Sequence, residues 1–377
     1  MRRITFALTS ALAACLATAC EPTPQTISEN FPWQEAVSDM RSALLGACSF
    51  EGVLYAVGGP YSDGTLYRFT GRRWSQEGSM LHGERLWSCW AGPSNQLIAV
   101  GQNGTIFRRN NEGWHRDQVP EEVLEADLYG VWGMPDGTAI AVGGGLPSPR
   151  AASVILHFDG VSTWTRADAE NIATQTLRSV WGTGADNYWA VGDDGAAAHY
   201  DGIDWRPSPT QVDDRLYGIY GSGPNDVYAV GGSGRGLILR WNGSSWVEFD
   251  EPPSALRSVV TSPNGPLYVA GNSGYVARYP RKSGLPSSEN STEATPFPHL
   301  RINALVGLGS AVMGAASTMD TDEETGDWKG GVVGHNRSFA GVVFDSNRPP
   351  DAGVPLGDAG IGDAGIGDAG PTPDATP

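Results

Sequence analysis

Basic residues are scarce in this chain of 377 residues: 25 Lys and Arg stand against 42 Asp and Glu, and the formal net charge is −17. A surface of that sign repels phosphate backbones and offers no basic stripe to anionic lipid headgroups. We therefore expect no nucleic-acid partner.

Residues spaced for metal or covalent chemistry are also missing. The six histidines show no His-x-x-x-His spacing and the four cysteines form no Cys-x-x-Cys pair, so a zinc site is not indicated. There is no Gly-x-Ser-x-Gly nucleophile elbow and no Gly-x-x-x-x-Gly-Lys phosphate loop. We predict no catalytic residue, no metal and no cofactor.

Long apolar runs are absent after residue 19, so no membrane-spanning helix is expected there. At the N-terminus, Arg2 and Arg3 precede an apolar, small-residue stretch that is typical of an export signal. Leu16-Ala17-Thr18-Ala19 before Cys20 resembles the lipobox of bacterial lipoproteins. That resemblance implies a lipoprotein signal peptide at residues 1-19, acylation of Cys20 and a linker at residues 20-30.

Acyl chains contribute about 0.8 kcal/mol per buried CH₂ and would hold the protein on a bilayer without a transmembrane helix. The expected location is the bacterial cell envelope, with the exported protein lipid-anchored at the outer membrane. Two alternatives stay open at this point. Cys15 also follows small residues and could be the acylated cysteine, or the signal could be an ordinary secretory one cut near Ala19.

Glycine and proline are abundant, at 51 and 26 residues, which favours many short strands over long helices. A repeat of roughly 42 residues runs through the chain. Each copy opens with a short apolar strand, at Leu44, Leu86, Leu128, Leu177, Leu216, Leu256 and Ile302.

Three further strands complete each repeat. An apolar run ending in glycine, such as Ala99-Val100-Gly101, leads through a tight turn into a third strand. A tryptophan then marks the fourth strand, at Trp74, Trp114, Trp164, Trp205 and Trp246. A four-stranded sheet cannot bury both of its faces alone, and radial stacking of seven sheets solves that problem. The sequence predicts an all-β fold, a seven-bladed β-propeller of four-stranded antiparallel blades, over residues 31-348.

Closure of the ring is predicted from spacing. Trp33 stands 11 residues before Leu44, within the 10 to 14 residues by which the other fourth-strand tryptophans precede the next repeat. We expect this N-terminal strand to be the outer strand of the last blade. A polar loop at residues 281-299 is expected in place of the sixth blade's fourth strand, and an acidic insertion at residues 318-329 in the seventh. The Gly/Asp/Ala/Pro tail at residues 349-377 is expected to be disordered.

The repeat resembles those of Asp-box-like propellers, which include the photosystem II assembly factor family and sialidase-like repeats. The residues that carry the resemblance are Ala99-Val100-Gly101-Gln102-Asn103-Gly104-Thr105-Ile106-Phe107 with Trp114 after them. It covers roughly residues 31-345 and implies fold more than activity. The full Asp-box order, Ser-x-Asp-x-Gly-x-Thr-Trp, is absent, and no motif places the arginine triad of sialidases.

Cys48 is the fourth residue after the opening leucine of its repeat, and Cys89 is the third residue after that of the next. Side chains alternate along a strand, so the two cysteines point to opposite faces of their blades. Because the front of one blade packs on the back of the next, this orientation suits a disulfide between blades, and an envelope compartment permits one. Two buried thiols are the alternative, since adjacent inner strands can lie too far apart for a bridge.

The position after each opening leucine supplies the candidate binding surface. A small residue always follows it, as expected where inner strands crowd the axis. Aromatic and guanidinium groups are favoured binding anchors. The alternative is that these side chains only fill the channel or pack between blades. The candidate partner-binding residues, which we call the axial ring, are Trp87, Tyr129, Arg178, Tyr217 and Arg257.

These features favour a monomeric, lipid-anchored, non-enzymatic propeller that binds a protein or glycan partner in the envelope. A glycan-acting hydrolase or lyase at the same axial mouth is the alternative, and it requires two carboxylates and a tyrosine within about 6 Å of one another. A third hypothesis is a surface-layer spacer whose tail tethers it to a neighbour.

Overall fold

The computed structural model describes residues 33–345, with gaps at 41, 61–62, 71–72, 78–80, 82, 146–152, 168–174, 309–310, 322–327 and 336–342. The predicted signal peptide at 1-19, Cys15, Cys20, the linker at 20-30 and the tail at 349-377 lie outside the described residues.

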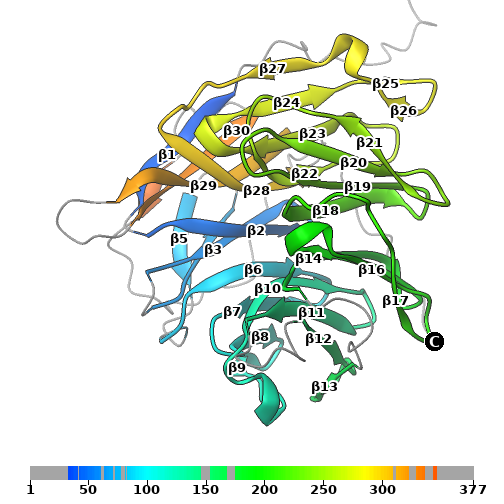
Figure 1. Ribbon diagram of the computed structural model, residues 1–377. Helices are drawn as coiled ribbons and strands as arrows, with labels where there is room; N and C mark the ends of the chain where they lie inside the picture. The colour runs from blue at the N-terminus through cyan, green and yellow to red at the C-terminus, as the bar shows by residue number, and fades with distance from the viewer. Residues whose placement is uncertain are drawn as a thin grey trace, which may run out of the picture.

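Seven antiparallel sheets radiate from a common axis, as Figure 1 shows, and confirm the predicted seven-bladed propeller. Blade 1 comprises β2 (Leu44–Phe50), β3 (Val53–Gly58), β4 (Thr65–Phe69) and β5 (Arg73–Glu77). Blade 2 comprises β6 (Leu86–Ala91), β7 (Leu97–Gly101), β8 (Ile106–Asn110) and β9 (Gly113–Arg116). Blade 3 comprises β10 (Asp127–Gly133), β11 (Ala139–Gly144), β12 (Ser153–Phe158) and β13 (Trp164–Arg166).

Blade 4 comprises β14 (Leu177–Gly184), β15 (Asn187–Gly192), β16 (Ala197–Tyr200) and β17 (Trp205–Pro207). Blade 5 comprises β18 (Leu216–Gly223), β19 (Asp226–Gly231), β20 (Leu237–Trp241) and β21 (Trp246–Asp250). Blade 6 comprises β22 (Leu256–Val260), β23 (Leu267–Gly271), β24 (Val276–Tyr279) and β27 (Thr292–Ala294). Blade 7 comprises β28 (Leu300–Leu308), β29 (Ala311–Thr321), β30 (Trp328–His335) and β1 (Gln34–Met40).

The helical segments among the described residues are four single 3-10 turns: η1 (Glu121–Val123), η2 (Asp193–Gly195), η3 (Asn272–Gly274) and η4 (Ser288–Asn290). Turns η2 and η3 connect the second and third strands of their blades. Each has a middle residue with positive φ, 52° at Asp194 and 53° at Ser273. The same local backbone is thus built twice, two blades apart.

The core lies between the blades. Seven clusters of buried apolar residues each draw on two neighbouring blades. For example, Val57 and Leu66 of blade 1 pack with Leu86 and Ala99 of blade 2. Each fully buried side chain of this kind contributes about 1.5 to 3 kcal/mol relative to exposure. Among the second strands, β7, β11 and β23 are buried at every residue because both of their faces are covered.

The repeated glycine and tryptophan have separate structural causes. A Cβ on Gly101 would lie 2.2 Å from the carbonyl oxygen of Arg85, so only glycine fits where the second strand passes the start of the inner strand. The fourth-strand tryptophans reach back to the preceding blade: Trp164 Nε1 donates to Asp117 at 2.9 Å, and Trp205 Nε1 donates to His157 at 2.9 Å. Trp246 Nε1 likewise donates to Ser208 of blade 4 at 3.1 Å, whereas Trp74 Nε1 is buried without a hydrogen-bond partner among the described residues.

The ring closes as the sequence predicts. Strand β1 pairs antiparallel with β30 and is the outer strand of blade 7, with Gln34 opposite Gly334. The inner strands β28 and β2 contact each other and complete the circle. Met40, at the end of β1, is 1% exposed and packs between blades 7 and 1.

Three details differ from the sequence prediction. Residues 281-299 do contain a fourth strand, because β27 pairs with β24 after a short hairpin of β25 (Arg281–Lys282) and β26 (Leu285–Pro286). Strands β29 and β30 extend into the expected acidic insertion and pair as far as Thr321 and Trp328. An unexpected strand, β31 (Val343–Asp345), adds in parallel to the outer edge of β5.

Removing β1 is expected to destabilise the whole ring, because it strips the last blade of its outer strand and exposes the core around Met40. A chain that starts at residue 42 should lose more than about 3 kcal/mol of unfolding free energy relative to one that starts at residue 31, since losing a buried methionine alone costs about 2 to 5 kcal/mol. Urea denaturation followed by tryptophan fluorescence measures the difference. Equal midpoints for the two chains would show that closure does not depend on this strand.

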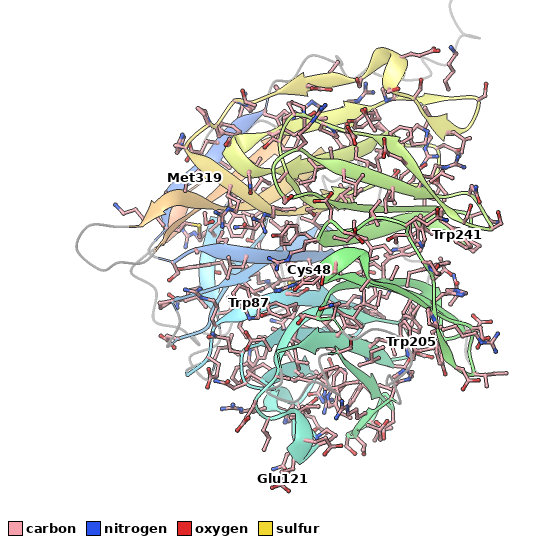
Figure 2. All side chains as sticks on the ribbon, in the orientation of Figure 1. Cys48, Trp87, Glu121, Trp205, Trp241 and Met319 are labelled. Atoms are coloured by element: carbon pink, nitrogen blue, oxygen red, sulfur yellow. A yellow bond between two sulfur atoms is a disulfide. The ribbon has the colours of Figure 1, made fainter. Side chains whose placement is uncertain are left out.

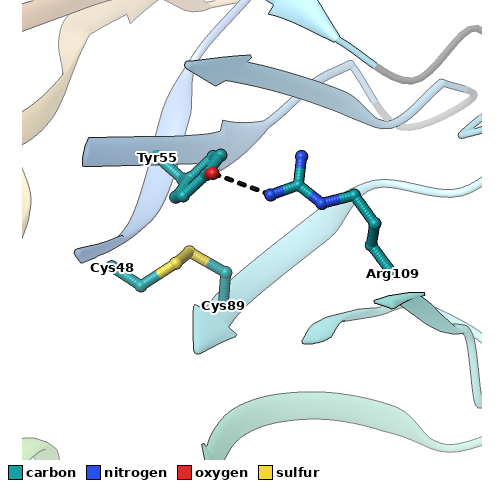
Figure 3. Close-up of a disulfide and its surroundings, with 4 residues drawn as sticks. All are labelled: Cys48, Tyr55, Cys89 and Arg109. Carbon is teal, nitrogen blue, oxygen red and sulfur yellow. Dashed lines mark hydrogen bonds between the residues drawn. A yellow bond between two sulfur atoms is a disulfide. The ribbon is translucent and has the colours of Figure 1, made fainter. Parts of the chain in front are cut away.

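Cys48 on β2 and Cys89 on β6 lie in the core between blades 1 and 2, where the structure joins them by a disulfide with Cα atoms 5.6 Å apart (Figure 3). That separation lies inside the range of about 4.4 to 6.8 Å that a bridge requires. Nearby, Arg109 Nη2 donates to Tyr55 Oη at 2.7 Å, a second contact between the same two blades.

We predict that this bridge forms in the oxidised protein. Replacing both cysteines, Cys48→Ala with Cys89→Ala, should lower the unfolding free energy by about 2 to 4 kcal/mol, because the crosslink restricts the unfolded chain. Peptide mapping by mass spectrometry without reductant tests the bond itself. Recovery of both peptides with free thiols from the native protein would contradict it.

Candidate functional site

A cavity on the propeller axis is the candidate site. All seven inner strands line it, and its lining includes each residue of the axial ring. Figure 2 marks Trp87, on β6, near the middle of the molecule. The structure therefore brings all five predicted residues to one cavity, from blades 2 to 6. Leu45 and Asn303 occupy the equivalent positions in blades 1 and 7.

A β-bulge explains why these side chains lie in the cavity. In blade 3, Leu128 pairs with Gly143 and Gly130 pairs with Val142, which leaves Tyr129 without a partner in the ladder. The same irregularity occurs at the equivalent residue of every inner strand. A bulge redirects the side chain of its extra residue. The small residue that follows each bulge is its visible signature in the amino-acid sequence.

Crowding at the axis requires those small residues. A Cβ on Gly46 would lie 2.6 Å from the carbonyl oxygen of Trp87 on the adjacent strand. At two other positions the small residue is a serine that bonds to the next blade. Ser179 Oγ accepts from the Ile219 amide at 3.3 Å, and Ser258 Oγ accepts from the Leu305 amide at 2.8 Å.

Within the axial ring, aromatic and guanidinium groups stack across blades. The rings of Trp87 and Tyr129 lie 5.4 Å apart between centroids. Arg178 Cζ lies 4.1 Å from the Tyr129 ring centroid, and Arg257 Cζ lies 3.8 Å from that of Tyr217. Each arginine thus lies over the ring of a tyrosine from the preceding blade, whereas the Trp87 and Tyr129 rings are tilted by 47° to each other.

The two arginines differ in their polar partners. Arg178 forms a bidentate ion pair with Asp193, with distances of 2.9 Å from Nε and 2.8 Å from Nη2. Burial acts to lower the pKa of Arg178, but the hydrogen bonds and charge of Asp193 outweigh burial and raise it. Arg257 Nε instead donates to the amide oxygen of Asn272 at 3.1 Å. Burial lowers the pKa of Arg257 below its ordinary value, and the adjacent Tyr217 does not offset that effect.

Further polar contacts surround the ring. Arg215 Nε lies 2.6 Å from Asp193 Oδ1, so that carboxylate serves two guanidinium groups, and Arg215 Nη1 donates to Tyr217 Oη at 3.3 Å. Tyr129 Oη donates to Asp127 at 3.1 Å. Burial is the main cause of the raised pKa of Tyr129, so its hydroxyl is protonated at neutral pH.

The far part of the cavity is aromatic and was not predicted. Trp132 and Tyr220 line it, and Trp181 packs against both, with ring centroids 5.7 to 6.3 Å apart. All three are the fifth residue counted from the opening leucine of their repeat. We call these equivalent aromatic positions the aromatic column, and they are visible when the repeats are aligned. The cavity therefore has a cationic part at the bulges and an apolar part beyond it.

Among the described residues, those that line the cavity include no Asp or Glu. Asp127 and Asp193 reach it only through their bonds to Tyr129 and Arg178. Within the ranges that the structure describes, no group of three His, Cys, Asp or Glu side chains is placed to hold a metal ion. No helix among the same residues is long and apolar enough to cross a membrane.

Comparison with known proteins adds one sequence relative. No family model matches the chain. The immune protein Tsi7 of Pseudomonas aeruginosa is 28% identical over 185 residues, which are 47% of this chain and 58% of Tsi7. The match thus spans little more than half the length of that curated relative.

Solved structures show the fold. YCF48 bound to D1 peptide superposes with a TM-score of 0.57 at 13% identity, over 81% of this chain and 96% of that one. YCF48 from Cyanidioschyzon merolae has a TM-score of 0.57 at 14% identity, over 81% and 99%. The WD40 propeller domain of Doa1 has a TM-score of 0.58 at 8% identity, over 81% and 98%. At these identities the likeness establishes the propeller architecture alone.

Proposed function

We propose that this chain is a non-enzymatic binding module that takes a protein partner at the axial cavity while a lipid on Cys20 holds it in the bacterial envelope. The observation that supports it best is the meeting of all five axial-ring residues in one cavity. Tryptophan, tyrosine and arginine supply most of the binding energy in protein interfaces, especially in partly enclosed pockets.

The comparisons favour a protein over a glycan as the partner. The sequence relative is named an immune protein, and one structural neighbour was solved with a peptide bound. The hydrolase or lyase alternative needs a pair of carboxylates at the axial mouth, and the cavity-lining residues within the described ranges include neither Asp nor Glu. No specific observation therefore favours it.

Crosslinking and mass spectrometry in intact envelopes test the binding surface. Trp87→Ala and Tyr217→Ala should reduce partner crosslinks roughly thirtyfold, the effect of losing about 2 kcal/mol at an interface anchor. The control is Ile203→Ala in the β16–β17 turn, where the side chain is 79% exposed and no cavity wall is formed. If the ring variants keep the crosslinks of the unaltered protein, the partner does not use the axial cavity.

The lipid anchor is tested separately by metabolic labelling with an alkyne-bearing fatty acid. Cys20→Ser should lose the label and leave the membrane fraction, whereas Cys15→Ser should keep both properties. Loss of the label in Cys15→Ser alone would identify Cys15 as the acylated residue instead. A chain that is never labelled would favour the ordinary secretory signal.

A further inference from the structure

Blades 4 and 6 contain the same local arrangement around an arginine of the axial ring. Arg178 and Arg257 are the bulged residues of β14 and β22. Each reaches the first residue of the 3-10 turn that lies 15 positions later, Asp193 in η2 and Asn272 in η3. The two turns share their backbone conformation, and the residue that meets the arginine is an aspartate in blade 4 and an asparagine in blade 6.

That difference changes the charge of the cavity. In blade 4 the carboxylate of Asp193 is an ionic partner of Arg178, which it shares with Arg215. In blade 6 an amide oxygen accepts the same kind of hydrogen bond and carries no charge, and no carboxylate in the described part of the chain forms an ion pair with Arg257. Arg257 stays protonated at neutral pH. The charges of Arg215 and Arg301 act on it as well, and both are positive.

A partly buried guanidinium without a counter-ion is costly to the folded protein. A carboxylate from outside would form a charge-assisted, two-pronged contact with it. We propose that Arg257 binds a carboxylate on a peptide segment of the partner, and that Asn272, in place of the aspartate found in blade 4, keeps this site open. This inference rests on the proposed function and names the chemistry that the axial cavity recognises.

The overall charge favours an isolated carboxylate over a polyanion. A chain with a net charge of −17 repels a highly charged polymer at long range, whereas a single carboxylate meets the local positive potential once it is inside the cavity. The Tyr217 ring beneath Arg257 and the aromatic column at Trp132 and Tyr220 offer apolar surface to the residues beside that carboxylate.

Three acetylated peptides of one length, each ending in phenylalanine, are the probes. One carries its single charge on a glutamate side chain, one carries it at a free C-terminus, and one is an uncharged amide. Titration followed by calorimetry and tryptophan fluorescence should show binding of one or both charged peptides at least tenfold tighter than the amide. The stronger of the two identifies the source of the carboxylate. Equal binding of all three peptides would overturn the inference. Galacturonate, a sugar that carries a carboxylate, tests a glycan source, and its binding without binding of either charged peptide would also overturn the inference.

Reciprocal variants separate this site from general packing. Arg257→Gln and Asn272→Asp should each weaken binding of the charged peptide at least tenfold, the first by removing the cation and the second by supplying an internal counter-ion. Asn272→Ser, which removes the amide but adds no charge, should stay within threefold of the unaltered protein. Asp193→Asn converts blade 4 to the arrangement of blade 6 and should tighten binding at least threefold. Thermal melting confirms that each variant is folded.

Full affinity in Asn272→Asp, or unchanged affinity in Asp193→Asn, would refute the carboxylate site. Its failure is distinguishable from failure of the proposed function. If Trp87→Ala loses partner crosslinks while Arg257→Gln and Asn272→Asp keep them, the axial cavity binds a partner without using a carboxylate. If the peptides behave as expected but none of the ring variants changes crosslinking, the cavity binds carboxylates and the protein partner lies elsewhere.

Discussion

Burial of both faces of every sheet is the constraint on which this structure depends. An isolated four-stranded blade exposes both of its apolar faces to water. Two neighbouring blades, one on each face, are needed to cover them. The seven cores show the result, since each draws its residues from two blades. Stability is therefore a property of adjacent pairs, as in other repeat proteins, with the difference that a closed ring has no terminal unit.

Crowding follows from the same constraint, because seven inner strands must converge on one axis. Small residues such as Gly46 and Ser258 allow the strands to approach, and the bulge beside each of them turns one side chain into the cavity. The bulged residue makes no ladder pair, so its identity contributes little to the sheet. Some cavity-lining residues also join neighbouring blades, since Ser179 and Ser258 each accept a hydrogen bond from the next inner strand.

Much of the architecture could be predicted from the sequence because its causes are local and repeat seven times. The run at Ala99-Val100-Gly101 indicates a strand buried on both faces, and the distance from Trp33 to Leu44 indicates closure, which the pairing of β1 with β30 confirms. Strand β27 was missed because Thr292 and its neighbours are polar and exposed, as suits an outer edge. Strand β31 lies outside the seven repeats, so the repeat pattern could not predict it.

The axial ring was predictable from the sequence, but the aromatic far part of the cavity and the electrostatics were not. The position after each opening leucine identified the axial ring, and the structure places all five residues around one cavity. The pairing of Arg178 with Asp193 could not be read from the chain, because a separation of 15 residues becomes a contact only through the register of β14 and β15. The aromatic column at Trp132 and Tyr220 was visible in the repeat but had no assigned face.

Closure by the first strand also has a kinetic consequence. Gln34 and Gly334 are 300 residues apart, so β1, the first of the described strands in the chain, pairs with one of the last. Bringing such distant ends together costs about 5 kcal/mol of chain entropy, which the other six blades largely remove by forming beforehand. Before β30 is available, the backbone donors and acceptors of β1 have no strand to pair with. Unpaired strand edges of this kind favour aggregation during folding.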